Sequence, residues 1–572
     1  MKKIFTYKIH LIYVLIILFA CFLLVFTNFS YDAEYQMSLA YRILKGDTMI
    51  EEMWEPHQTS AFLCAIIMKT YMLITGTTTG IVVFTQAVGL LIRGCISVCI
   101  YSVLHKYTDK IPAAIAGIIY LLISPKDLLI PEFSNMQLWF ATLMALGLIQ
   151  YFDTSKYRYL FCSAVCLCLG VLSYPSFVIA YFGGAALLRV YSRKYKKDLL
   201  LYTGTCVVFG GLFVLYLLSQ VSIDTILTIV PRMLSLEPTH TINIFDKLLS
   251  HIVDLLRMFL ISGCVLAGGF LVEQIKILIF KIKYKQNAKR VNMNSYILNA
   301  WLLMMVCFLV NIIRAENNGF ASYPILMIIC YGLITARHLL PKEKRVYLCG
   351  FWISIMNFLS TLLLSDHPAI HALPYMVLAL SFSILPLYRK FQLYTEKIEL
   401  KRLFLCATHL FLILLIFRCI YLHVPISGRE QICSLSSDLA LIRSGPAKGL
   451  ITNEEGAAKQ RDSYMEWKRY ITPGDTVWLL GDPLDTLGYL YEDVEVGAPS
   501  VMSTPTYNEN ILYYWELNPE KYPDVIILQS GFGELSWELR TNSWLMKWLE
   551  QEYQAATVVD GNYWRYYFKE KQ

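Results

Sequence analysis

The stretch LIYVLIILFACFLLVFTNFSYDAEYQMSLAYRILKGD, residues 11–47, contains the transition that decides the fold. An apolar run that continues to Phe29 is long enough to cross a bilayer core of about 30 Å, and two acids, Asp32 and Glu34, follow at once. No small-residue cleavage site follows the apolar core, so we interpret 9–29 as a retained first helix and not as a signal peptide. The chain is expected to cross the membrane and then to present an acidic segment at its surface.

The composition of the chain is that of a membrane protein. Of its 572 residues, 56% are hydrophobic and only 16% are charged, whereas a soluble protein of this size carries about 25% charged residues. Apolar runs of roughly 20 residues recur along most of the sequence. We therefore predict a polytopic α-helical membrane protein with about 13 transmembrane helices, near 9–29, 80–104, 111–124, 135–152, 158–173, 175–190, 198–218, 252–280, 295–313, 321–339, 346–364, 369–387 and 403–422.

The distribution of Lys and Arg gives this arrangement an orientation in the cell (plasma) membrane. Cytoplasmic loops collect these residues, and most of them fall in alternate loops if the N-terminus is cytoplasmic and the C-terminal part is extracytoplasmic. The apolar stretch 59–75 is then assigned to the outer surface, because counting it as a span would move RKYKKD (193–198) and KIKYKQNAKR (281–290) outside. The net charge of +7 is therefore an orientation signal, aided by anionic membrane lipids, and no nucleic-acid partner is expected.

The sequence divides into a membrane domain and a polar C-terminal domain. The expected ranges are 1–422 for the transmembrane domain, 30–79 and 219–251 for its first and second large outer loops, and 423–572 for the C-terminal domain. In the last of these, DTVWLLG (475–481) and DVIILQS (524–530) are short runs typical of buried strands, and ATVVDGNYWRYYF (556–568) predicts a hairpin around an Asp-Gly turn. An extracytoplasmic α/β domain is therefore predicted at the C-terminus.

Polar residues of several kinds converge on the predicted outer face. Ionisable groups near membrane depth are costly and usually functional. A carboxylate base activates a hydroxyl, and cations or a metal stabilise a departing phosphate. Oxygen and imidazole donors such as those of Glu55, His57 and His240 suit a divalent ion. The candidates are Asp32 and Glu34 for catalysis, Glu55, His57, Lys126, Glu132 and Arg314 for substrate or phosphate binding, and Glu55 with His240 for a metal.

The first loop resembles that of the GT-C superfamily of polytopic membrane glycosyltransferases. In that superfamily an acidic motif opens the loop and is followed by Tyr and an A-x-x-L-x-x-G helix, which YDAEYQMSLAYRILKG (31–46) matches. The loop ends in a proline motif before a surface helix, as WEPHQ (54–58) does here, and SPKDLLIPEFSN (124–135) matches a short acidic loop. The chain departs from the family in the Asp-Ala-Glu spacing of its acids, and Glu55 stands where many relatives have a basic residue.

The resemblance is to family 39, aminoarabinose transferase, protein O-mannosyltransferase and oligosaccharyltransferase branches. It implies transfer of a sugar from a polyprenyl-phosphate donor to an envelope glycan, glycolipid or protein, with Asp32 as base and Lys126 or Arg314 as the cation at phosphate. Three alternatives remain open. They are a transporter or flippase of lipid-linked saccharides, a polymerase of such saccharides, and a non-catalytic envelope scaffold. A transporter predicts polar residues at the bilayer midplane, where the sequence places little besides Arg93.

Overall fold

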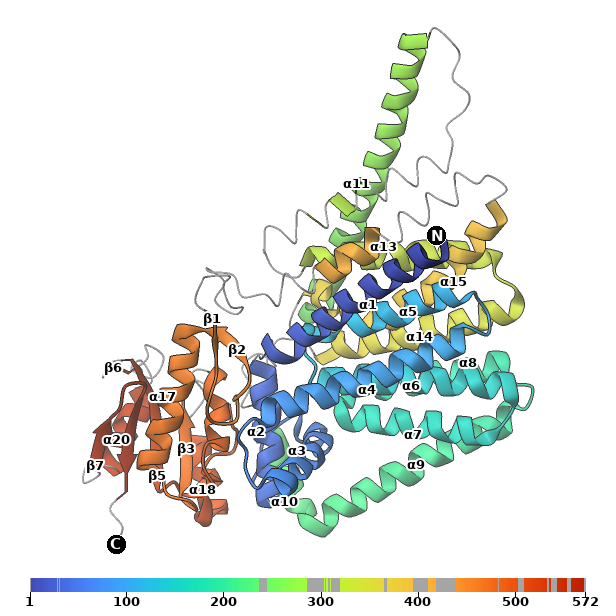
Figure 1. Cartoon of the computed structure of the whole chain (residues 1–572). Helices are drawn as coiled ribbons and strands as arrows, with labels where there is room; N and C mark the ends of the chain where they lie inside the picture. The colour runs from blue at the N-terminus through green and yellow to red at the C-terminus, as the bar shows by residue number, and fades with distance from the viewer. Residues whose placement is uncertain are drawn as a thin grey trace.

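The fold consists of a bundle of long helices and a smaller unit built around a β-sheet (Figure 1). The computed structural model describes residues 2–27, 29, 31–235, 244–284, 303, 305–306, 309, 319–364, 368–394, 410–417, 439–481, 483–502, 509–531, 534–535, 543–552 and 557–569. The chain is mainly helical in these ranges, and the strands lie in its last third.

The bundle is formed by helices that run side by side and bury a common apolar core. Its helices are α1 Lys2–Thr27, α4 Ile81–Leu104, α5 Lys110–Leu122, α6 Phe133–Thr154, α7 Tyr157–Ser173, α8 Ala180–Tyr191, α9 Tyr195–Gln220, α11 Ile244–Tyr284, α13 Gly319–Thr335, α14 Pro341–Leu364 and α15 Val377–Tyr394. Large apolar side chains such as Val207 and Leu215 on α9 are mostly exposed outside this core. An outward apolar surface of this kind is expected where helices face lipid.

Six helices in the described ranges are long and apolar enough to cross a membrane, by length and composition alone. They are Gln58–Thr75, Ile81–Leu104, Tyr195–Gln220, Phe245–Ile279, Pro341–Leu364 and Ala369–Lys390, and the bent pair Val14–Thr27 with Asp32–Lys45 makes a seventh if it is one span. The chain is therefore a mainly helical protein with several candidate spans. The predicted helix 295–313 lies largely outside the described residues, and of 403–422 the structure describes 410–417 as helical.

Four short helices gather at the end of the bundle that faces the sheet (Figure 1). They are α2 Tyr31–Lys45, the 3₁₀ helix Gln58–Ser60, α3 Ala61–Thr75 and α10 Ile223–Ser235. The predicted surface segment 59–75 corresponds to the second and third of these helices, which also pass the length test for a span. In the structure α3 packs against α2 beside the sheet unit, so its surface placement stays a prediction that this position favours.

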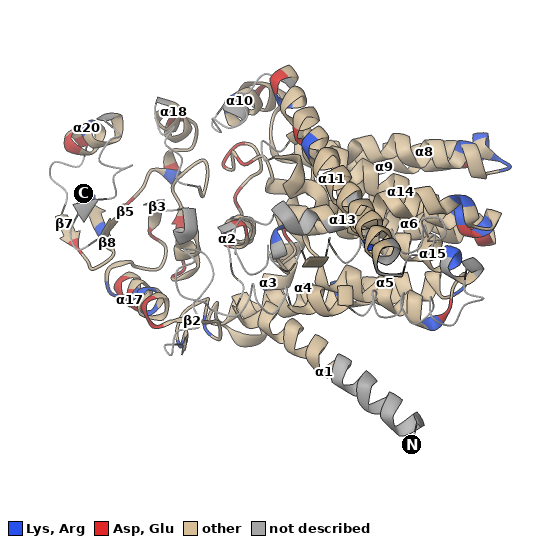
Figure 2. Cartoon of the chain, turned by 90° about the horizontal axis from the view of Figure 1, so that it is seen from above, with Lys and Arg blue, Asp and Glu red and all other residues tan. Residues whose placement is uncertain are grey.

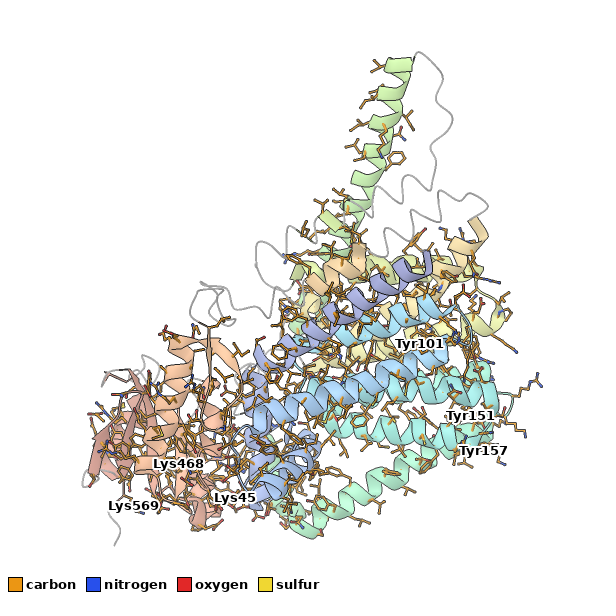
Figure 3. The ribbon with its side chains drawn as sticks, viewed as in Figure 1. Lys45, Tyr101, Tyr151, Tyr157, Lys468 and Lys569 are labelled. Atoms are coloured by element: carbon orange, nitrogen blue, oxygen red, sulfur yellow. The ribbon has the colours of Figure 1, made fainter. Side chains whose placement is uncertain are left out.

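Lys and Arg gather at the opposite end of the bundle, around the loops that follow α6 and α8 (Figure 2). Arg345 pairs there with Asp153 at 2.7 Å. Tyr151 and Tyr157 lie at the same end, with ring centroids 6.0 Å apart (Figure 3). Lys and Arg collect in cytoplasmic loops and Tyr is enriched at both membrane boundaries, so this end of the bundle is the one that the sequence predicts to be cytoplasmic.

The C-terminal unit contains a six-stranded mixed sheet, a separate sheet of the two antiparallel strands β1 and β2, and several helices. The strands are β1 Leu439–Leu441, β2 Ile451–Asn453, β3 Thr476–Leu480, β4 Glu495–Val496, β5 Val525–Gly531, β6 Glu534–Leu535, β7 Thr557–Asp560 and β8 Trp564–Phe568, and the helices include α17 Glu454–Tyr470, α18 Glu509–Leu517 and α20 Ser543–Glu552. The main order is β4-β3-β5-β8-β7, with β3 parallel to β4 and β5 and the remaining pairs antiparallel. The two runs predicted as buried strands are β3 and β5, and the predicted hairpin is β7–β8.

The sheet unit and the first loop, which follows α1, share one hydrophobic core. Met37, Trp54 and Met68 from the loop belong to the same cluster of buried side chains as Trp478 and Ile527 from the sheet. The loop residues therefore pack against a segment more than 400 positions further along the chain.

Candidate functional site

The candidate site lies at the start of α2, where Asp32 meets the loop between α5 and α6. A carboxylate oxygen of Asp32 lies 2.8 Å from the Lys126 ammonium nitrogen. The two side chains keep 24% and 34% of their surface exposed, respectively. This pair brings together a candidate base and a candidate phosphate-binding cation that are separated by 94 positions in sequence.

Lys126 is held by local backbone geometry. It lies in the short 3₁₀ helix Pro125–Asp127 with a left-handed φ of 55°, which a lysine rarely adopts. Its ammonium nitrogen sits 4.4 Å from the centroid of the Phe133 ring, in a cation–π contact. The backbone of the same loop passes so close to α4 that a Cβ at Gly89 would lie 1.8 Å from the Leu129 carbonyl oxygen. Only glycine at that position allows the loop to reach its place.

Glu132 joins the cluster as the N-cap of α6. Its two carboxylate oxygens accept hydrogen bonds from the backbone N–H groups of Ser134 at 2.8 Å and Asn135 at 2.7 Å. The side chain is fully buried, and this burial raises the pKa of Glu132 to about 7, against the opposing effect of Lys126 and with a smaller contribution from Asp32. Glu132 therefore caps α6 and fixes the loop that carries Lys126.

His57 belongs to an aromatic group beneath Lys126. Its ring stacks on Phe133 with a centroid distance of 4.2 Å and an interplanar angle of 8°, and it lies 5.4 Å from the Tyr174 ring. The first loop thus reaches the α6 and α7 ends through this histidine. The sequence analysis selected His57 but not Phe133 or Tyr174, which look like ordinary core residues until the fold places Phe133 against Lys126 and Tyr174 beside His57.

Glu34 and Glu55 do not join this cluster. Residues two apart on a helix point about 200° apart around its axis, so Glu34 faces away from Asp32. It is buried and lies 3.5 Å from the Leu487 backbone nitrogen of the C-terminal unit. Glu55 accepts hydrogen bonds from the Tyr35 hydroxyl at 2.9 Å and from the Val501 N–H at 2.6 Å. The two glutamates face the sheet unit, so neither one neighbours Lys126.

The proposed metal site receives no support from the described residues. Both carboxylate oxygens of Glu55 already accept hydrogen bonds from protein groups, and the described part of the chain contains no group of three or more His, Cys, Asp or Glu side chains arranged to hold an ion. The metal site of Glu55 and His240 therefore stays a prediction. His240 and Arg314 lie outside the described residues, so their roles stay predictions.

Sequence reasoning missed the charged cluster that joins the first loop to the C-terminal unit. Asp47 lies 2.6 Å from the Arg42 Nε atom and 2.6 Å from the Lys521 ammonium nitrogen. All three side chains are buried. Arg42 and Asp47 are visible as charges in the first loop, but no pattern in the sequence links them to a lysine more than 470 positions away.

Three solved structures of the Archaeoglobus fulgidus oligosaccharyltransferase are similar to this chain. The apo form matches at 11% identity with a TM-score of 0.44, over 90% of this chain and 69% of that chain. The complex with Zn and sulfate matches at 10% identity with a TM-score of 0.45, over 90% and 68%. AglB in complex with an inhibitory peptide and a dolichol-phosphate matches at 11% identity with a TM-score of 0.40, over 90% and 69%.

No protein-family model matches the sequence, and no curated protein matches it. TM-scores as low as these carry no conclusion about function, which therefore rests on the residues of the site. Over 90% of its length, the chain is similar in fold to an archaeal oligosaccharyltransferase.

Proposed function

We propose that this chain is a GT-C-type membrane glycosyltransferase. It transfers a sugar from a polyprenyl-phosphate donor to a hydroxyl of an envelope glycan, glycolipid or protein at the outer face of the membrane. The observation that carries the proposal is the half-buried Asp32 carboxylate 2.8 Å from the Lys126 ammonium group. A base and a phosphate-binding cation stand side by side at the end of an apolar helix bundle, where a lipid-linked donor and a water-soluble acceptor can meet.

The chemistry follows from this pair. The anionic phosphate of the donor competes with Asp32 for Lys126, which leaves the Asp32 carboxylate available to the acceptor hydroxyl. Asp32 takes the hydroxyl proton as the acceptor oxygen forms its bond to the anomeric carbon. The bond from that carbon to the phosphate oxygen breaks, and polyprenyl phosphate leaves with its negative charge held by Lys126. A single displacement of this kind inverts the anomeric centre.

A transporter or flippase of lipid-linked saccharides is the main alternative. A transporter binds its substrate near the bilayer midplane. Arg93, a charged residue within a predicted membrane helix, is the candidate that best fits this role. The Arg93 Nε and Nη2 atoms donate to the Tyr120 carbonyl oxygen at 3.0 and 2.8 Å, close to the end of α5. This contact favours a structural role for Arg93, and the cluster around Asp32 favours an enzyme.

Replacing Asp32 by Asn tests the proposal. Asn keeps the shape of the side chain but removes the proton acceptor, so the glycan product should disappear from the envelope and the lipid-linked donor should accumulate. Both are measured by mass spectrometry of envelope glycans and extracted lipids, with protein level and membrane insertion checked by immunoblot. Asp224→Asn, a change of the exposed carboxylate on α10, is the matched control.

Three results distinguish the proposed glycosyltransferase from its alternatives. Unchanged glycans in the Asp32→Asn strain would refute the assignment of Asp32 as base. Short saccharides left on a lipid diphosphate would indicate a polymerase instead. Loss of product together with donor trapped on the inner leaflet would indicate a flippase.

A further inference from the structure

The helix that carries Asp32 is held from two sides. At its start, Asp32 pairs with Lys126 of the membrane bundle. Further along α2, several side chains contact the C-terminal unit. The Ser38 hydroxyl donates to the Thr486 carbonyl oxygen at 2.8 Å, and the Lys45 ammonium group lies 2.8 Å from Asp493. Lys45 is found where α2 meets the sheet unit (Figure 3).

A buried set of charges lies at the centre of this contact. Asp47, just beyond the end of α2, lies 2.6 Å from both Arg42 and Lys521, whose side chains are 0% and 7% exposed. Lys521 also lies 3.4 Å from Glu52 and 3.3 Å from Glu495. Charges are stable in a protein interior only when each one has its partner, so this set fixes the relative position of the first loop and the C-terminal unit closely.

The next segment of the first loop is attached to the same part of the C-terminal unit. The Trp54 N–H donates to the Pro499 carbonyl oxygen at 2.8 Å, and the Val501 N–H donates to Glu55 at 2.6 Å. Arg42 donates to the same Pro499 carbonyl at 3.1 Å. The segment 499–501 therefore forms hydrogen bonds with two parts of the first loop, Arg42 and the pair Trp54 and Glu55.

We propose that Lys521 and Asp47 dock the C-terminal unit onto α2 and thereby position the Asp32 carboxylate for transfer. The proposal rests on the proposed function, and it makes Lys521 and Asp47 positioning residues that act through α2. A displacement of about 1 Å at a reacting group is enough to lower a rate strongly. The role of the C-terminal unit is then to hold the first loop against the bundle, and Glu55 contributes to the docking contact.

The experiment compares four full-length variants in the same strain. Lys521→Met removes the buried cation, Lys521→Arg keeps it, Lys547→Met removes an exposed cation on α20 of the sheet unit, and Asp32→Asn removes the base. Envelope glycan product is measured by mass spectrometry, and hydrogen exchange of 47–55 and 495–502 in the purified proteins reports the docking contact directly.

Lys521→Met should increase exchange in both segments and lower the product by about tenfold or more. Lys521→Arg should retain most of the product, and Lys547→Met should match the wild type in both measurements. A normal product level in Lys521→Met despite faster exchange would overturn the positioning role. Unchanged exchange in Lys521→Met would overturn the docking role.

The proposed function fails separately, because it requires that Asp32→Asn alone abolish the product. If Lys521→Met does not accumulate in the membrane, Lys45→Met replaces it, since Lys45 lies at the partly exposed rim of the same contact. Lys45→Met should also increase hydrogen exchange and reduce the product, both to a smaller extent than Lys521→Met. A normal product level together with faster exchange would contradict the proposal.

Discussion

At the residue scale, the site distinguishes two acids that look equivalent in sequence. Asp32 and Glu34 are two positions apart, and both are candidate catalytic groups. The helical backbone turns them to opposite sides, so Asp32 meets Lys126 and Glu34 meets the backbone of Leu487. The choice of Asp32 as the base remains a prediction, and its position beside a cation is the physical reason to prefer it.

Glu132 gives a prediction about pH. Burial raises its pKa from 4.5 to about 7 in the folded protein. The folded state therefore holds this proton more tightly than the unfolded chain. Its stabilising contribution is complete below about pH 4.5 and is lost as the pH rises through about 7. A shift of this size corresponds to roughly 3 kcal/mol.

The expected result is that the wild type loses thermal stability relative to Glu132→Gln between pH 5 and pH 8. The unfolding temperatures of both proteins in the same detergent give the comparison, and the difference between them removes contributions from other carboxyl groups with raised pKa values, such as those of Glu55 and Glu466. Parallel curves across this range would contradict the role of Glu132 as a buried proton-binding group.

At the element scale, the loop between α5 and α6 packs directly against the backbone of α4. Gly89 is the position on α4 where the loop backbone comes closest, and Lys126 and Glu132 lie on either side of that contact along the loop. A glycine within an apolar helix does not by itself indicate that another backbone segment packs against it. The approach is visible only after the two elements are placed against each other.

Gly89→Ala should therefore displace the loop and disturb the Asp32–Lys126 pair. Overpacking of this kind costs about 1–3 kcal/mol, and the product of the proposed transfer should fall with it. Gly94→Ala on the same helix is the matched control, because a Cβ at Gly94 meets nothing within 4 Å. Thermal stability and envelope glycan level are measured for both, and equal behaviour of the two variants would refute the contact.

At the scale of the whole molecule, the C-terminal unit and the first loop pack together around one hydrophobic core. The expected division at residue 423 describes where the sequence becomes polar, and it remains a proposal about domains. The hydrophobic core instead combines first-loop residues such as Trp54 with sheet residues such as Trp478. Composition identifies the polar segment and its strands, but it cannot reveal which distant surface they cover.

The orientation of the molecule in the membrane is a separate prediction. If basic loops are cytoplasmic, a cysteine introduced at Lys196, in the first turn of α9, should resist a membrane-impermeant maleimide added to intact cells. A cysteine introduced at Asn562, in the β7–β8 turn, should react with it. Both residues are exposed, and labelling is compared with that of the unsubstituted protein and of opened cells. The opposite pattern would reverse the orientation.

Apolar length and residue periodicity are local properties, so the sequence alone predicts the membrane character, most of the described helices and the principal strands. It also selects Asp32, His57, Lys126 and Glu132 as candidates. Which of these side chains meet depends on the tertiary structure. The Asp32–Lys126 pair, the close approach at Gly89 and the buried Asp47–Lys521 contact join distant segments. Such contacts depend on how whole elements pack, and packing leaves no periodic pattern in a single sequence.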